Sequence, residues 1–344
     1  MADLSTNYMG LKLKNPVIIG SSGITSTISE IKCASDSGAG AVVLKSIFEE
    51  QIRHEISKFI DRGGASMDTF QKGYDDVLAS RSFDYAQAFD YVSDYAKEHT
   101  LGSYLKFIEE AKRASAIPVI ASINCVSAYD WHYFARRIEA AGADALELNI
   151  YILPSNTEKN AADNEQVYFN VVEAVLKQVK IPVSVKVGYY FSSLAGMLVK
   201  LSQTGIKGLV MFNRPFHPDI DINTMEITAK YLLSDPSEYA MTLRWMALLS
   251  GRVGCDLVGS TGIHTAESAL KQLLAGATAI QMASVLYKNG FGHVGTVVKG
   301  INEWMDAKGF RTLDDFRGKL SQENIENPAD YERVQFMKLY SKIV

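Results

Sequence analysis

The sequence predicts an α/β fold of the (β/α)8 TIM-barrel type, because strand-like and helix-like segments alternate and eight strand-like runs occur. Each run is short, apolar and rich in β-branched residues, and nearly all follow Gly, Pro or a small-residue turn. A doubly wound sheet is the alternative, but no G-x-G-x-x-G loop follows the first run. In chain order the runs are Val17–Gly20, Ala41–Lys45, Pro118–Asn124, Ala145–Ile150, Pro182–Val187, Gly208–Asn213, Cys255–Ser260 and Ala279–Ser284.

Segments with helical periodicity separate the strands, and two insertions interrupt them. The insertions cover about 47–100, after strand two, and 214–239, after strand six. Both leave C-terminal strand ends, where barrels build active sites, so each is expected to be a lid or a structural excursion. The tail 297–344 is expected to form helices that cover the barrel, which makes 1–344 a single domain. The helical segments are Ile28–Ser37, Leu101–Ser115, Trp131–Ala141, Val167–Val179, Ser193–Thr204 and Ala240–Leu249.

The stretch from Asp256 to Leu286 reads as strand, helix, strand, with small-residue turns after Gly259 and at Gly276. In barrels, this late pair of loops commonly holds phosphate through backbone amides and a short helix. The same pattern also occurs in βαβ units of other parallel proteins, so alone it does not decide the fold.

Composition excludes several function classes. The chain has 344 residues, 47% of them hydrophobic, and a net charge of −4, which gives no electrostatic case for nucleic acid or an anionic membrane. No apolar run is long enough to span a bilayer, and the start of the chain lacks the features of a signal peptide. The three cysteines lack metal or disulfide spacing, so no metal and a reducing cytoplasm are expected.

Polar residues gather at the predicted C-terminal strand ends, where a buried parallel strand would otherwise be apolar. Two lysines and three asparagines on one rim predict a polar cup for an anionic planar ligand. Lys186 admits a Schiff base with a carbonyl substrate, a charged role beside a redox cofactor, or pairing with Glu147. The strand-end residues are Ser21, Ser22, Gly23, Lys45, Ser46, Asn124, Asn149, Lys186, Asn213, Ser260, Thr261, Gly262, Ala283 and Ser284.

Several of these segments resemble motifs of the dihydroorotate dehydrogenase family over nearly the whole chain. Asn15-Pro16 to Gly23 is similar to N-P-x-x-x-A-S-G, and Val43 to Ser46 to V-x-K-[TS]. Leu146 to Asn149 is similar to the start of L-E-L-N-x-S-C-P-N, and Val185-Lys186 to the family's V-K. Thr261 to Ile263 and Gly276 to Ser284 are similar to G-G-I and G-A-x-x-x-Q-x-x-[TS].

The resemblance implies an FMN barrel in which a proton leaves one carbon of dihydroorotate while hydride passes from its neighbour to flavin N5. It places this activity in pyrimidine biosynthesis, with fumarate or, through a partner subunit, NAD as acceptor, and it implies a homodimer. The acceptor of this chain is unidentified. The implied cofactor-binding residues are Ser21, Ser22, Gly23, Lys45, Ser46, Asn124, Asn149, Lys186, Gly259, Thr261, Gly262, Ala283 and Ser284.

The chain departs from the family at the catalytic base, which is a Cys or Ser in N-x-S-C-P-N. The corresponding positions here are Ile152 or Leu153, neither of which accepts a proton. Ser155 and Tyr151 are the remaining candidates beside the catalytic Lys186, although an ordinary phenol has a pKa of about 10.

Substrate recognition departs as well, since residues 47–100 contain no asparagine for the ring and Arg214 follows Asn213. Arg214 is expected to bind a carboxylate or to pair with Asp219 or Asp221. The expected substrate-binding residues are Lys45, Asn149, Asn156, Asn213 and Arg214. Two alternatives stay open, namely a non-catalytic or regulatory FMN-binding barrel and a Lys186 Schiff-base lyase.

Overall fold

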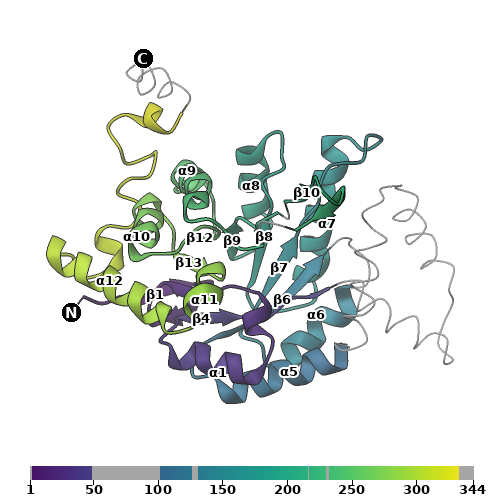
Figure 1. Ribbon diagram of the computed structural model, residues 1–344, viewed down its shortest axis with the longest axis horizontal. Helices are drawn as coiled ribbons and strands as arrows, with labels where there is room; N and C mark the ends of the chain where they lie inside the picture. Colours follow the sequence, from purple (N-terminus) through teal and green to yellow (C-terminus); the bar gives the residue numbers. More distant parts are fainter. Residues whose placement is uncertain (1, 49–100, 126–130, 216, 230–231, 333–344) are drawn as a thin grey trace.

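The computed structural model describes residues 2–48, 101–125, 131–215, 217–229 and 232–332. Within these ranges eight parallel strands form a closed barrel, because β3 pairs with β13 and β4 with β6 (Figure 1). This confirms the predicted TIM barrel. The strands are β3 (Val17–Ile19), β4 (Ala41–Val43), β6 (Val119–Cys125), β7 (Ala145–Ile150), β8 (Val183–Val187), β9 (Gly208–Met211), β12 (Asp256–Gly259) and β13 (Ala279–Met282).

Helices lie outside the strands (Figure 1), and buried apolar side chains fill the space between the two layers. Helix α7 begins well before the predicted Val167, because the Asn160 side chain caps Asp163 N–H while Asp163 caps Asn160 N–H. The helices are α1 (Ile28–Asp36), α5 (Leu101–Ala114), α6 (Trp131–Ala140), α7 (Ala161–Leu176), α8 (Leu194–Ser202), α9 (Tyr239–Leu249), α10 (Ala266–Ala275), α11 (Ser284–Asn289) and α12 (His293–Lys308).

A hairpin at the start of the chain, which the sequence reasoning did not predict, closes the N-terminal end of the barrel. Strands β1 (Thr6–Tyr8) and β2 (Leu11–Leu13) pair antiparallel. Tyr8 is fully buried beside Gly208, where a Cβ would lie 2.9 Å from the Tyr8 ring. The backbone N–H of Met9 donates to Asp256 Oδ2 at 2.7 Å. The hairpin thus joins the apolar cluster inside the barrel.

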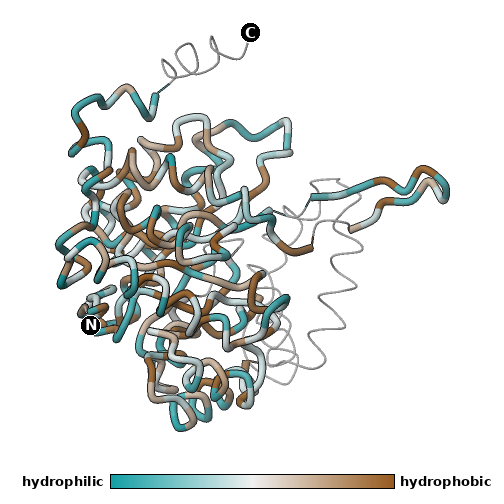
Figure 2. The backbone as a smooth tube through the Cα atoms, turned by 60° about the vertical axis from the view of Figure 1, so that its left-hand side comes forward, coloured by the Kyte–Doolittle hydropathy of each residue, from teal (hydrophilic) through white to brown (hydrophobic). Residues whose placement is uncertain are grey.

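The two insertions differ in how much of them the structure describes. After a short break, β4 is followed by β5 (Ile47–Phe48), which pairs with the same neighbour, β6. The first insertion therefore begins later than residue 47. Residues 49–100 lie outside the described residues. The second insertion contains a hairpin of β10 (Asp219–Asp221) and β11 (Glu226–Thr228) and the short helix η2 (Pro236–Glu238). The hairpin projects from the body of the molecule (Figure 2). It carries exposed apolar side chains, among them Ile220 and Ile227.

The C-terminal part is helical only at its start. Gly309, with φ of 75°, ends α12 in a left-handed conformation. After it come turns and two short 3-10 helices, η3 (Leu313–Asp315) and η4 (Pro328–Tyr331). The prediction of helices is therefore wrong for most of 309–332, and 333–344 lies outside the described residues. Among the residues that the structure describes, no helix has the length and apolar character needed to cross a membrane.

Candidate functional site

Strand register brings three of the predicted residues into one row at the C-terminal end of the barrel. Asn124 on β6 is level with Asn149 on β7, which is level with Lys186 on β8. Asn213, just beyond β9, donates from Nδ2 to Asn149 Oδ1 at 2.9 Å. The three asparagines are half-buried and Lys186 is 8% exposed. Residues from four strand ends therefore meet, as the sequence predicted.

A chain of hydroxyl groups ties the first strand ends to β6. Ser21 Oγ lies 3.0 Å from Ser46 Oγ, and Ser46 Oγ lies 2.8 Å from Ser122 Oγ. Ser22 precedes the 3-10 helix η1 (Gly23–Thr25) as its N-cap, and Gly23 is exposed. The Lys45 backbone N–H donates to Thr25 O at 3.0 Å, and its side chain is half-buried. These contacts fix the backbone of both loops.

The end of β12 and the turn that follows it contain small residues for steric reasons. Thr261 and Gly262 have left-handed φ angles of 75° and 71°. Thr261 Oγ1 donates to Phe212 O at 3.0 Å. A Cβ on Gly262 would overlap the backbone nitrogen of Tyr239, and a Cβ on Gly259 would lie 3.2 Å from Gln272 Oε1. Close approach of neighbouring segments thus accounts for both glycines.

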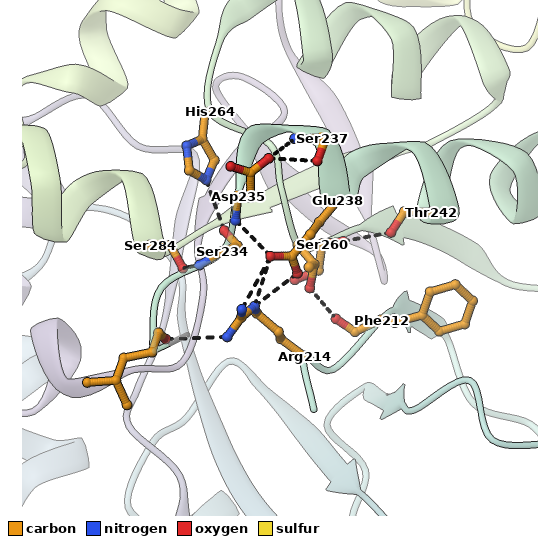
Figure 3. Close-up of polar contacts among 12 residues, drawn as sticks. Phe212, Arg214, Ser234, Asp235, Ser237, Glu238, Thr242, Ser260, His264 and Ser284 are labelled. Carbon is orange, nitrogen blue, oxygen red and sulfur yellow. Dashed lines mark hydrogen bonds and ion pairs between the residues drawn. The ribbon is translucent and has the colours of Figure 1, made fainter. Parts of the chain in front are cut away.

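The end of the second insertion docks on the same loops (Figure 3). Ser234 N–H donates to Ser284 Oγ at 3.0 Å, and Ser234 Oγ lies 2.9 Å from His264 Nε2. Burial, followed by nearby Lys288, lowers the pKa of His264. Ala283, which precedes Ser284, is the N-cap of α11. The predicted phosphate residue Ser284 is therefore held by the insertion.

Arg214 forms an ion pair within the protein. Its Nε lies 2.9 Å from Glu238 Oε2, and Glu238 Oε1 also accepts from Asp235 N–H at 2.7 Å (Figure 3). The partner carboxylate is Glu238, whereas the sequence had offered Asp219 and Asp221. Because Glu238 offsets its charge, Arg214 binds a substrate carboxylate only if this pair is shared or broken.

Three tyrosines stand beside the row of strand-end residues. The Tyr151 and Tyr190 rings are 6.2 Å apart edge to face, and the Tyr189 and Tyr190 rings are 4.8 Å apart. Burial and the neighbouring Tyr190 raise the pKa of Tyr151 well above its usual value. Burial raises the pKa of Tyr189 to about 12. The phenols of Tyr151 and Tyr189 therefore stay protonated near pH 7.

The segment that would carry the family's base lies mostly on the surface. Ser155 is exposed, and its N–H donates to Leu153 O at 2.8 Å. Asn156 Oδ1 accepts from Glu158 N–H at 2.8 Å. Among the described residues, no hydrogen bond joins Ser155 or Asn156 to the strand-end row. These two predicted residues are therefore not joined to the others by hydrogen bonds among the described residues.

Two residues that the sequence reasoning did not assign to the site lie directly below Lys186. Its Nζ donates to Gln281 Oε1 at 3.0 Å, and Gln281 Nε2 donates to Glu147 Oε2 at 2.6 Å. Direct pairing of Lys186 with Glu147 had been the alternative, but Gln281 stands between them. The sequence did carry a signal for Gln281, because a glutamine is unusual in the middle of a buried strand, here Ala279–Met282.

The donor set of the cup consists of ammonium, carboxamide and hydroxyl groups around a partly buried floor. Such groups match a planar ligand that carries carbonyl oxygens and gains negative charge. No group of three His, Cys, Asp or Glu side chains with metal-binding geometry occurs among the described residues.

Comparisons with known proteins show which family the chain is similar to. The family model described as "Dihydroorotate dehydrogenase" matches residues 3–305. "Dihydroorotate dehydrogenase B (NAD(+)), catalytic subunit" of Thermoplasma acidophilum is 26% identical over 92% of this chain and 99% of its own. The protein of the same name from Methanocella arvoryzae is 26% identical over 92% and 97%. "Dihydroorotate dehydrogenase A (fumarate)" of Lactococcus lactis is 24% identical over 92% and 99%.

Proposed function

The chain belongs to the dihydroorotate dehydrogenase family, and from this membership we propose that it is an FMN-dependent oxidoreductase. Its substrate would be dihydroorotate or a related small anionic ring of the dihydropyrimidine kind. The observation that carries the proposal is the row of Asn124, Asn149 and Lys186 in register, with Asn213 bonded to Asn149. An ordered set of donors at the barrel mouth suits such a ring.

FMN fits the donor set described above. When bound, it would accept the hydride from the substrate. Lys186 would stabilise the negative charge that develops on the cofactor, and Asn124 and Asn149 would bind carbonyl groups at the mouth. The rest of the FMN molecule would be held by four loops, at Ser21–Ser22, Lys45–Ser46, Thr261–Gly262 and Ala283–Ser284. Asn213 orients Asn149 through its hydrogen bond and would contact the substrate.

A non-catalytic or regulatory FMN-binding barrel is the second candidate function, and the missing base favours it. Ile152 and Leu153 stand at the base position, Ser155 is exposed, and the pKa of Tyr151 is raised. A neutral phenol does not remove a proton from carbon efficiently near pH 7. On this reading, the cofactor cup persists while the reaction is lost.

A Schiff-base lyase at Lys186 has weaker support. The amine that would attack a carbonyl donates to Gln281 and lies near the carboxylate of Glu147. Attack on a substrate carbonyl would require Nζ to leave its hydrogen bond with Gln281. This candidate requires a colourless protein that borohydride traps onto its substrate.

The deciding experiment is the visible spectrum of the purified protein, taken without oxygen before and after dihydroorotate is added. Flavin absorbance that bleaches at a catalytic rate supports the oxidoreductase. Flavin absorbance that dihydroorotate and other dihydropyrimidines leave unchanged supports the non-catalytic barrel. A protein that has no flavin and does not bind added FMN contradicts both.

A further inference from the structure

Three polar side chains from three different strands meet inside the barrel, below the open end. Glu147 on β7 is 1% exposed, Gln281 on β13 is 2% exposed and Lys186 on β8 is 8% exposed. Gln281 lies between the other two, at 2.6 Å from Glu147 Oε2 and 3.0 Å from Lys186 Nζ. A buried carboxylate and a buried ammonium are thus joined through one amide.

The amide of Gln281 can be oriented in only one way. Its Nε2 is a donor and faces the carboxylate, while its Oε1 is an acceptor and faces the ammonium. Reversing the amide would set oxygen against oxygen and nitrogen against nitrogen. Gly20 leaves room for this arrangement, since a Cβ there would lie 3.2 Å from Gln281 Oε1. The end of the Lys186 side chain is therefore fixed from below.

Glu147 accepts from Gln281 through Oε2, but this hydrogen bond does not require a charged acceptor. Its Oε1 has no hydrogen-bond partner among the described residues, although the atom is buried. Leaving a buried carboxylate oxygen without a partner costs free energy. A neutral side-chain oxygen would accept from Gln281 equally well, so the negative charge is the feature of Glu147 that needs a role.

We propose that Gln281 and Glu147 are positioning residues, which hold the Lys186 ammonium at the barrel mouth and set the electrostatic potential there. The inference rests on the proposed function, because the group that would feel this potential is FMN. Gln281 fixes the position of the Lys186 ammonium through its hydrogen bond. Glu147 contributes a negative charge that partly offsets the positive charge of the lysine. The two residues therefore act on the cofactor in opposite senses.

The test uses full-length protein loaded with FMN and measures the reduction potential of the flavin and the dissociation constant for FMN. Glu147→Gln keeps the size of the side chain and an acceptor for Gln281, but it removes the negative charge. We expect a higher reduction potential, because a more positive surrounding stabilises the reduced, anionic flavin. The affinity for FMN should stay within about threefold of wild type, since the Lys186 anchor remains.

Gln281→Met keeps the volume but removes the amide that holds Lys186. We expect a lower reduction potential and FMN binding weakened about tenfold, since a charge-assisted hydrogen bond to the ammonium is lost. Gln322→Leu is the matched control, because Gln322 is also a buried glutamine, 5% exposed, but bonds to Pro328 O and Glu332. Its potential and affinity should match those of wild type.

Shifts of opposite sign in the two variants support the inference, because a loss of packing alone would not reverse the sign. Potentials that stay at the wild-type value, or that move in the same direction, overturn it while the proposed function stands. If Gln281→Met does not fold, the sign of the shift in Glu147→Gln decides alone. A wild-type protein that does not bind FMN overturns the proposed function and this inference with it.

Discussion

At the scale of single residues, Tyr151 tests whether the chain retains a base. Its pKa is raised by burial and by Tyr190, so the phenol stays protonated throughout the neutral range. We expect Tyr151→Phe to slow reduction of the flavin by dihydroorotate by less than about tenfold, whereas losing a true base costs about 10²–10⁴-fold. Anaerobic stopped-flow absorbance between about pH 6 and pH 9 measures the rate.

Tyr190→Phe is the matched control for this experiment, because it removes a neighbouring phenol from the same group of rings. Similar profiles for both variants agree with the expectation. A loss above about a hundredfold in Tyr151→Phe alone, together with loss of a pH-dependent limb, would show that Tyr151 is the base.

Sequence reasoning found the residues that stand at strand ends, but not the contacts between distant strands. Lys186, Asn149 and Asn213 follow from where each strand stops, which is a local property. The contact of Gln281 with Lys186 and Glu147 depends on the register of three strands, which a single sequence does not give. The partner of Arg214 was missed for the same reason, since several carboxylates were available.

At the scale of elements, the close contact between Gly262 and the start of α9 predicts a strong effect on stability. Gly262→Ala places a Cβ against the Tyr239 backbone at a left-handed φ of 71°. We expect the free energy of unfolding to fall by at least about 3 kcal/mol. Gly309→Ala is the control, since Gly309 is left-handed with φ of 75° but no atom lies within 4 Å of the added Cβ.

The control should lose only about 1 kcal/mol, which is the cost of the left-handed conformation. Urea unfolding of both variants separates this conformational cost from the clash. Equal losses in Gly262→Ala and Gly309→Ala would mean that the backbone of Glu238–Tyr239 moves aside readily.

Elements with a strong local pattern were predicted well, and those set by tertiary contacts were not. All eight barrel strands follow from apolar β-branched runs, and each lies within its predicted range apart from small shifts at the ends. The hairpin β1–β2 was missed because its strands are three residues long and alternate buried with exposed positions. The tail was wrong because Gly309 and Gly318 take left-handed conformations.

At the scale of the whole molecule, Tyr8 links the N-terminal hairpin to the barrel interior. Its hydroxyl and that of Ser184 are buried, and neither makes a hydrogen bond of good geometry with a described residue. We expect Tyr8→Phe to leave the free energy of unfolding unchanged or to raise it by up to about 1 kcal/mol. Tyr8→Ala should lower it by about 3–5 kcal/mol, because it leaves a cavity in the floor of the barrel.

Thermal and urea unfolding of the two variants measure these changes. A loss of more than about 2 kcal/mol in Tyr8→Phe would show that the hydroxyl has a partner, such as a buried water. A small loss in Tyr8→Ala would show that the hairpin is not required to fill the barrel.

Closure of the barrel by this hairpin also bears on the order of events during turnover. Among the described residues, Tyr8, Met9 and Leu13 fill the N-terminal end of the barrel, so compounds would reach the cup from the side of the strand ends. On the proposed function, the compound that gives up electrons and the compound that takes them would use that side in turn. Product would leave before the acceptor enters, so that reduction and reoxidation alternate in a ping-pong cycle. A fold feature at the bottom of the barrel would thereby set the kinetic scheme at its top.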